Sequence, residues 1–163
     1  MDWEIVVKND CDLTLAEIDG IFLVYNECFY DNGLVNPEHI QTAKKSIGKQ
    51  KIWQWYFARL KKTRQIVGIA NFVYDYVGVD KKLSVNRDQG ENLTSVATLK
   101  NYQGLGISKA IMTKLLEDHA DVDLVVEIRK DDKNCAKLFE YYRNFGFSKK
   151  SENAEAFYFV KKP

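Results

Sequence analysis

Hydrophobic positions recur at three- and four-residue spacing in several segments of the chain, which is typical of α-helices with one buried face. The clearest case is residues 15–29, with Ile18, Ile21, Phe22, Tyr25 and Phe29 on related faces. Asp12 or Thr14 is placed to cap this helix at its start. The same spacing predicts helices over residues 107–119 and 134–145, and Asn36-Pro37-Glu38 marks the start of another that reaches about Ile47.

Other segments are rich in β-branched and aromatic residues and predict strands. In chain order they are residues 4–8, 53–61, 65–76, 93–99, 123–128 and 156–160, with a further strand if residues 147–150 also pair. The polar turn Lys62-Thr63-Arg64 predicts a hairpin between the second and third of these strands. Residues 81–90 are polar and predict a loop. This order of elements indicates a mixed α/β fold, and the length favours one domain over residues 1–163.

The composition narrows the class of protein. The 163 residues are 45% hydrophobic and 13% aromatic, which is enough to build a core and excludes disorder as the main state. No stretch approaches the roughly 20 apolar residues that a membrane span needs, and the N-terminus lacks the features of a secretory signal. The three cysteines and two histidines have no metal-site or disulfide spacing. We therefore expect a cytoplasmic protein with no metal and no membrane partner.

The net charge of +1 argues against a broadly basic nucleic-acid binder, but the charge is unevenly distributed. Residues 1–43 carry nine acidic residues and one basic residue, a charge of −8, and the rest of the chain carries +9. This division fits two electrostatic fields, with the acidic part of the chain attracting a cationic partner and the basic part attracting an anionic partner. It equally fits solvent-exposed helix faces that simply differ in charge.

Residues 100–108 (KNYQGLGIS) lie between a predicted strand and a predicted helix. Two glycines two residues apart let backbone N–H groups converge, and the helix N-terminus adds partial positive charge, so the segment suits a phosphate group. A Walker P-loop is excluded, because Ile-Ser-Lys follows Gly106. A dinucleotide-binding fingerprint is excluded as well, because Lys109 stands where its third glycine is needed. A G-x-G pair is also found in turns that bind nothing.

The run Ser95–Met112 (SVATLKNYQGLGISKAIM) resembles the acetyl-CoA-binding motif of the GCN5-related N-acetyltransferase (GNAT) superfamily, which is a strand, a linker, [QR]-x-x-G-x-[GA] and a helix. Ser108 replaces the last Gly or Ala of that motif. Asn134–Phe147 (NCAKLFEYYRNFGF) resembles the family's second signature, an Asn, a helix with a Tyr, and Gly-Phe. The resemblance covers nearly the whole chain. It implies the GNAT fold, a mixed, mostly antiparallel sheet of about six or seven strands flanked by about four helices, and acetyl-CoA-dependent N-acetyltransferase activity.

The resemblance also implies an acetyl-CoA site. Backbone N–H groups would hold the pyrophosphate at Gln103, Gly104, Leu105, Gly106, Ile107 and Ser108. The strand Val96, Ala97 and Thr98 would pair with the pantetheine arm and hold the acetyl carbonyl oxygen. Lys109 and Lys100 would add positive charge, or are ordinary solvated lysines. Asn134 would contact the arm of CoA, or cap its own helix.

For catalysis, the second signature implies Tyr142 as the acid that protonates the departing thiolate. Asn134 lies one residue farther from Gly146 than is common in the family, so Tyr141 remains an alternative, and core packing is a further interpretation of either residue. Glu91 is the expected base, with Glu127 as a second candidate. We expect direct transfer in a ternary complex, because no cysteine indicates a covalent acyl-enzyme.

In the family, the first two helices and their connection border the acceptor groove, and here they overlap the acidic segment. Glu27 or Asp31 is therefore expected to recruit a cationic amine. The acceptor is left open among small-molecule amines (polyamine, aminoglycoside, amino acid), a peptide N-terminus and a protein lysine. Binding to nucleic acid is not supported by any basic, aromatic stripe, and a homodimer is allowed. Two other hypotheses are a GNAT-fold module that binds CoA without turnover and a scaffold without enzymatic activity.

Overall fold

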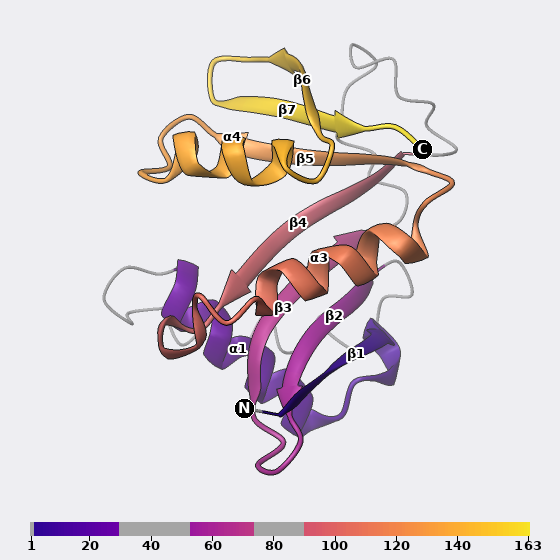
Figure 1. Ribbon diagram of the computed structural model, residues 1–163, viewed down its shortest axis with the longest axis vertical. Coiled ribbons are helices and arrows are strands. Elements are labelled where there is room, and N and C mark those ends of the chain that lie inside the picture. Colours follow the sequence, from indigo (N-terminus) through magenta and orange to yellow (C-terminus); the bar gives the residue numbers. More distant parts are fainter. Residues whose placement is uncertain (1, 30–52, 74–89) are drawn as a thin grey trace. The chain divides into compact units, whose positions relative to one another are not determined.

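The computed structural model of the protein describes residues 2–29, 53–73 and 90–163. In this part of the chain the helices are α1 (Leu15–Phe29), α3 (Ile107–Asp118) and α4 (Cys135–Arg143), with short 3-10 turns η1 (Asp10–Asp12) and η4 (Lys100–Tyr102) (Figure 1). The strands are β1 (Trp3–Asn9), β2 (Trp53–Leu60), β3 (Ile66–Val73), β4 (Gly90–Thr98), β5 (Asp123–Arg129), β6 (Ser148–Glu152) and β7 (Ala156–Lys161).

These elements confirm the mixed α/β fold class and most of the predicted segments. The helix predicted over residues 15–29 has the predicted ends, and the segment that begins near residue 147 does pair, as β6. The helix predicted from Asn36 to about Ile47 lies outside the described residues, as does the predicted loop up to residue 89.

The seven strands follow the order β1-β2-β3-β4-β5-β7-β6. The sheet is mostly antiparallel, with β4 and β5 as a parallel pair. The chain divides into two compact units. The first comprises Met1–Phe72 and Ser95–Leu115, and the second comprises Val73–Thr94 and Leu116–Pro163.

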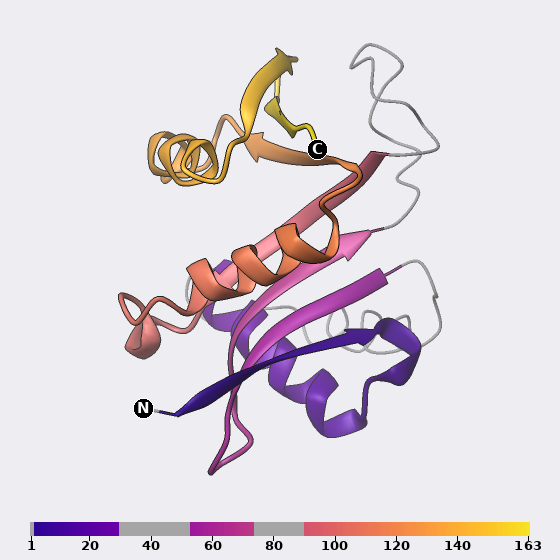
Figure 2. The same ribbon diagram turned by 45° about the vertical axis from the view of Figure 1, so that its right-hand side comes forward.

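In the first unit, helices α1 and α3 lie on opposite faces of β2 and β3 (Figures 1 and 2). Helix α3 buries Ile107, Ile111, Met112 and Leu115 and leaves Lys109 and Thr113 exposed. Gly68 on β3 makes this packing possible, because a Cβ atom there would lie 2.7 Å from Cγ2 of Ile107. The N-terminus of α3 is thus held against the sheet by close apolar contact.

Helix α1 begins with a capping box. The Thr14 hydroxyl accepts a hydrogen bond from the backbone N–H of Glu17 at 3.3 Å, and the Glu17 carboxylate accepts one from the backbone N–H of Thr14 at 2.9 Å. Of the two predicted caps, Thr14 is therefore the one that forms. The same carboxylate is paired with Lys8 at 2.8 Å and with Arg59 at 3.3 Å. One largely buried side chain thereby ties α1 to β1 and β2.

Replacing Glu17 with Gln is expected to lower the free energy of unfolding by about 2 kcal/mol at neutral pH, because Lys8 and Arg59 lose a poorly solvated counter-charge. Burial alone would raise the pKa of Glu17, but hydrogen bonds from Lys8 and Thr14 outweigh it and hold the pKa below the ordinary 4.5. A carboxyl of lowered pKa stabilises the fold above its unfolded pKa and loses that contribution as the pH falls through the folded pKa.

Urea unfolding of wild type and Glu17→Gln across pH measures this. The difference in stability should hold steady above about pH 5.5 and shrink below about pH 4. Glu127→Gln, which removes the same charge from an exposed position on β5, is the control and should shift stability by less than about 0.5 kcal/mol. A difference for Glu17→Gln that stays constant down to pH 3 would show that its charge does not matter.

In the second unit, β7 pairs with both β5 and β6, and α4 packs on β7. The ring of Phe139 lies 4.8 Å from the rings of Phe157 and Phe159. Asn134 occupies the cap position of α4, but its side chain makes no capping hydrogen bond. The carboxylate of Asp132 accepts the backbone N–H of Asn134 itself at 2.7 Å, in the turn before the helix. The capping role considered for the Asn134 side chain is therefore wrong.

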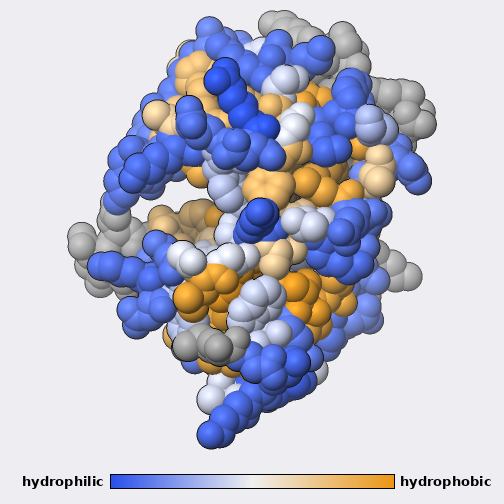
Figure 3. Space-filling view, viewed as in Figure 1, coloured by the Kyte–Doolittle hydropathy of each residue, from blue (hydrophilic) through white to orange (hydrophobic). Residues whose placement is uncertain are grey.

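No helix among the described residues combines the length and the apolar character needed to cross a bilayer. Hydrophilic residues cover much of the surface that Figure 3 shows, and hydrophobic residues form smaller patches on it.

Candidate functional site

The connection from β4 to α3 has the backbone of an anion-binding loop. Gly104 and Gly106 have φ angles of +77° and +78°, in the left-handed region that glycine adopts at least cost. A Cβ atom at either position would meet nothing within 4 Å. Residues 103–106 are exposed, and α3 starts directly after them, with the N–H of Ala110 donating to the carbonyl of Gly106 at 2.9 Å. Left-handed residues in front of a helix N-terminus are the backbone arrangement that directs N–H groups toward a bound anion.

Strand β4 extends beyond its ladder with β5. The parallel ladder joins Gly90–Leu93 to Asp123–Val126, whereas β4 continues to Thr98. Val96 is half-buried, and Ala97 and Thr98 are buried. The predicted cofactor residues of this strand, of the glycine loop and of the start of α3 thus form one continuous segment of the first unit.

Helix α1 is attached to this segment at three successive points. The Tyr25 hydroxyl lies 2.5 Å from Oγ of Ser95, and the Cys28 thiol donates to the Thr98 carbonyl at 3.5 Å. One residue before Cys28, the carboxylate of Glu27 accepts the backbone N–H of Lys100 at 2.8 Å. The sequence contains no local signal for these contacts, because the partners are about 70 residues apart along the chain.

Aromatic rings gather around Tyr25 in the same unit. Its ring centroid lies 5.0 Å from that of Phe29 and 6.2 Å from that of Trp55, and Trp53 stands 6.4 Å from Trp55. The Trp55 side chain also donates to the buried Asp10 carboxylate at 3.0 Å. Burial raises the pKa of the Cys28 thiol in this surrounding, and the nearby Glu27 charge adds to the effect.

The predicted acid lies in the second unit. Tyr142 of α4 is buried, with its ring 5.6 Å from Phe147 and 5.3 Å from Tyr141. Burial strongly raises the pKa of Tyr142, and the neighbouring Tyr141 adds to the shift. Tyr141 is half-buried, and Asn134, before α4, is exposed.

The two candidate bases also belong to the second unit. Glu91 stands opposite Leu124 in the ladder of β4 with β5, and its side chain lies outside the described part of the structure. Glu127 is exposed on β5, opposite Tyr158 of β7. Lys100 and Lys109 are exposed in the first unit, and Asp31 lies outside the described residues.

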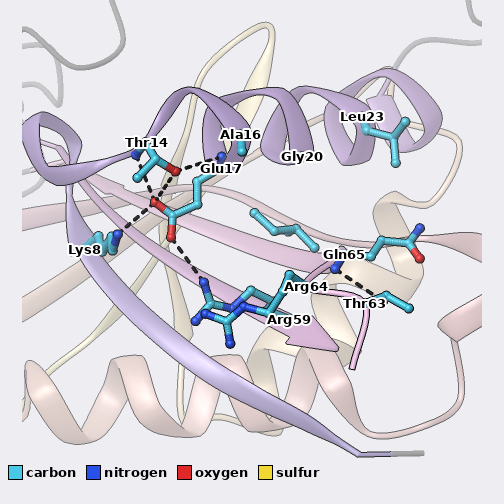
Figure 4. Close-up of a pocket in the computed structure, with 11 residues that line it drawn as sticks. Lys8, Thr14, Ala16, Glu17, Gly20, Leu23, Arg59, Thr63, Arg64 and Gln65 are labelled. Atoms are coloured by element: carbon cyan, nitrogen blue, oxygen red, sulfur yellow. Dashed lines mark hydrogen bonds and ion pairs between the residues drawn. The ribbon is translucent and has the colours of Figure 1, made fainter. Parts of the chain in front are cut away.

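A hollow of about 650 Å³ lies between α1 and the hairpin of β2 and β3 (Figure 4). Three cations, Lys8, Arg59 and Arg64, line it. Glu17 points toward Lys8 and Arg59 (Figure 4), and Glu4 pairs with Arg59 at 2.8 Å and Arg64 at 3.0 Å. Each of the three cations has a carboxylate partner within the unit, with Glu4 and Glu17 each shared by two of them, so we assign the network to holding α1 on the sheet.

In the described ranges, no group of three or more His, Cys, Asp or Glu side chains is placed to hold a metal ion. The oppositely charged side chains that the structure brings together form ion pairs inside each unit, such as Lys8 with Glu17 in the first and Lys130 with Glu152 in the second.

The family model and the solved structures that resemble this chain agree on one family. The model of the acetyltransferase (GNAT) family matches residues 18–147. An acyl-CoA N-acyltransferase from Pseudomonas aeruginosa is 14% identical, with coverage of 98% of this chain and 99% of that chain and a TM-score of 0.70. A structure described as histone acetyltransferase HPA2 and related acetyltransferase from Corynebacterium glutamicum is 17% identical, with coverage of 98% and 96% and a TM-score of 0.69.

The ribosomal-protein-S18-alanine N-acetyltransferase from Escherichia coli is 11% identical, with coverage of 97% and 93% and a TM-score of 0.64. A comparison with curated proteins gives no match. The solved structures show the fold, and the family model shows the membership. The chain belongs to the GNAT family of acetyltransferases.

Proposed function

We propose that the protein is an acetyl-CoA-dependent N-acetyltransferase that passes the acetyl group directly to a primary amine in a ternary complex. The observation that carries the proposal is the loop of Gly104 and Gly106, left-handed at both glycines, open to solvent and directly before α3. Such a loop accommodates a pyrophosphate, because no side chain fills it and N–H groups line it. The family match crosses both compact units, which supports one domain over residues 1–163.

The residues predicted from the sequence bind different parts of acetyl-CoA. Backbone N–H groups of Gln103 to Ser108 bind the pyrophosphate, helped by the charge of Lys109 or Lys100, and Asn134 contacts the arm of CoA. The part of β4 that continues beyond the β5 ladder, Val96 to Thr98, pairs with the pantetheine arm as an added strand. Its backbone also stabilises the negative charge that develops on the acetyl oxygen.

Transfer of the acetyl group forms one bond and breaks another. The amine nitrogen forms a bond to the acetyl carbon while the bond from that carbon to sulfur breaks. Glu91, or Glu127 as the second candidate, removes the proton that the amine must lose. Tyr142 supplies a proton to the departing thiolate. Burial keeps its phenol protonated throughout the physiological range, and the same rise in pKa makes it a weaker acid than a solvent-exposed tyrosine.

Tyr142→Phe is expected to lower kcat by about 10- to 100-fold, because the variant has no proton to donate. The melting temperature and the KM for acetyl-CoA should change little, because a Phe ring preserves the contacts with Phe147 and Tyr141. Tyr141→Phe is the matched control and should retain kcat. If Tyr141→Phe lost the activity and Tyr142→Phe retained it, the acid would be Tyr141. Full activity in both variants would show that solvent protonates the thiolate.

The proposed function is tested by release of free thiol from acetyl-CoA in a panel of polyamines, aminoglycosides, amino acids, peptides and lysine-containing proteins. We expect release with at least one class of amine, together with CoA binding by calorimetry. Binding of CoA with no release across the panel would favour the module without turnover. A folded protein that does not bind CoA would contradict both hypotheses.

A further inference from the structure

The side chain of Glu27 caps a backbone turn whose preceding residue provides no capping hydrogen bond. The turn η4 (Lys100–Tyr102) follows β4 directly, and the residue before it, Leu99, provides no side-chain hydrogen bond to its N–H groups. The first residues of a helical turn have no N–H acceptor within the turn itself. The carboxylate of Glu27, from the end of α1, accepts the first of these, the N–H of Lys100, at 2.8 Å. A charged acceptor makes this bond stronger than a neutral one.

This contact is close in sequence to the glycine loop. The N–H of Gln103 donates to the carbonyl of Lys100 at 3.3 Å, and the Gln103 side chain donates to the carbonyl of Thr98 at 3.1 Å. The turn at Lys100 therefore sets where Gln103 stands, and Gln103 is the residue before Gly104. The contacts of Tyr25 with Ser95 and of Cys28 with Thr98 hold the same end of α1 along β4.

We propose that Glu27 is a positioning residue for the CoA site, which fixes the strand-to-loop turn through the N–H of Lys100. The inference rests on the proposed function, in which this loop binds the pyrophosphate. It replaces the expectation that the charge of Glu27 recruits the amine acceptor. Positioning requires a side-chain oxygen that can accept the N–H of Lys100, whereas recruitment of a cationic amine requires a negative charge.

Two conservative variants separate these requirements. Glu27→Gln retains an oxygen at the same reach and loses the charge. Glu27→Asp retains the charge, but its carboxylate is one methylene shorter and falls short of Lys100. Positioning therefore predicts a defect in Glu27→Asp that is much smaller in Glu27→Gln, and recruitment predicts the reverse.

The experiment measures the Kd of CoA by calorimetry and the KM of acetyl-CoA and of the acceptor over a range of salt. We expect Glu27→Asp and Glu27→Ala to raise the Kd of CoA by about tenfold and Glu27→Gln by less than about threefold. The KM of the acceptor should not change in any variant. Asp19→Ala, which removes an exposed carboxylate from the same helix, is the control and should match wild type.

Three results would overturn the inference. The first is a wild-type Kd for CoA in Glu27→Asp and Glu27→Ala. The second is an equal loss of CoA affinity in Glu27→Gln and Glu27→Asp. The third is a salt-dependent rise in the KM of the acceptor in Glu27→Gln. Hydrogen exchange at residues 100–103 without ligand distinguishes failure of the inference from failure of the proposed function. Faster exchange in Glu27→Asp than in Glu27→Gln would support the capping contact even if wild type did not bind CoA, and equal exchange would refute it.

Discussion

A glutamate in place of Gly106 should weaken CoA binding by at least about 100-fold, because its carboxylate would stand where a pyrophosphate is expected to bind and would repel it. The φ of +78° makes any L-residue strained at this position, by about 1 kcal/mol. A Cβ atom there meets nothing within 4 Å, so the substitution does not clash and the fold should persist. Calorimetry with CoA and the KM for acetyl-CoA measure the effect.

Two variants separate strain from charge. Gly106→Ala adds the strain without the carboxylate and should weaken CoA binding by only about 5- to 10-fold. Gly146→Ala imposes the same kind of strain at a φ of +88° in the second unit, and should lower the melting temperature without the loss of CoA affinity. Wild-type affinity in Gly106→Glu would exclude this loop as the pyrophosphate site.

Replacing Gly68 with Ala should lower the free energy of unfolding by about 2 kcal/mol, because the added methyl group overpacks the contact between β3 and α3. The new Cβ would lie 2.7 Å from Cγ2 of Ile107 and 3.3 Å from Cδ1 of Ile111. Ile107 is branched at Cβ and starts α3, so the helix N-terminus must move. Since Gly106 is joined to Ile107, we also expect a several-fold rise in the KM for acetyl-CoA. Thermal and urea unfolding measure the first effect, and steady-state kinetics measure the second.

Gly20→Ala is the matched control on α1. Its Cβ would meet only the side chain of Ile66, at 3.1 Å or more, and Ala is the better helix former by about 0.5–1 kcal/mol. Its stability should stay close to that of wild type. The cost of Gly68→Ala should be smaller in an Ile107→Ala background than in wild type, because that background lacks the methyl groups that clash. An equal cost in both backgrounds would show that the cost at Gly68 arises elsewhere.

Hydrophobic spacing and capping residues predict most helices and strands, because the local preferences of these segments agree with the contacts that they make in the fold. In α1 the apolar spacing, the Thr14 cap and Glu17 three residues later all favour a start near Leu15, where the helix does begin. The apolar spacing predicts a helix over residues 134–145, and α4 spans Cys135–Arg143. The helix ends earlier because the N–H groups of Phe145 and Gly146 turn back to the carbonyls of Tyr142 and Arg143, before the left-handed Gly146.

The candidate site was predictable only as far as it is continuous in sequence. The glycine loop and the end of β4 form one segment, and the motif indicates it. The attachment of Glu27 to Lys100 joins residues that a motif does not relate, so the carboxylate was expected to face an acceptor.

A count of charge along the sequence misses contacts for a related reason. Asp2, Glu4 and Glu17 of the acidic N-terminal segment pair with bases that include Lys61, Arg59 and Arg64, which the count had assigned to the other part of the chain. Three of the nine acidic residues of that segment are therefore paired with bases of the first unit, and a count along the sequence does not detect pairs across strands.

The half-buried thiol of Cys28, hydrogen-bonded to Thr98 at the end of β4, bears on the chemical fidelity of the proposed reaction. A cysteine beside a bound thioester is a rival nucleophile, which would capture the acyl group by thiol exchange. Only the thiolate attacks efficiently, and burial raises the pKa of this thiol. At neutral pH Cys28 therefore stays protonated and inert. An acyl donor bound along this strand would be kept for the amine, without loss to the protein's own sulfur.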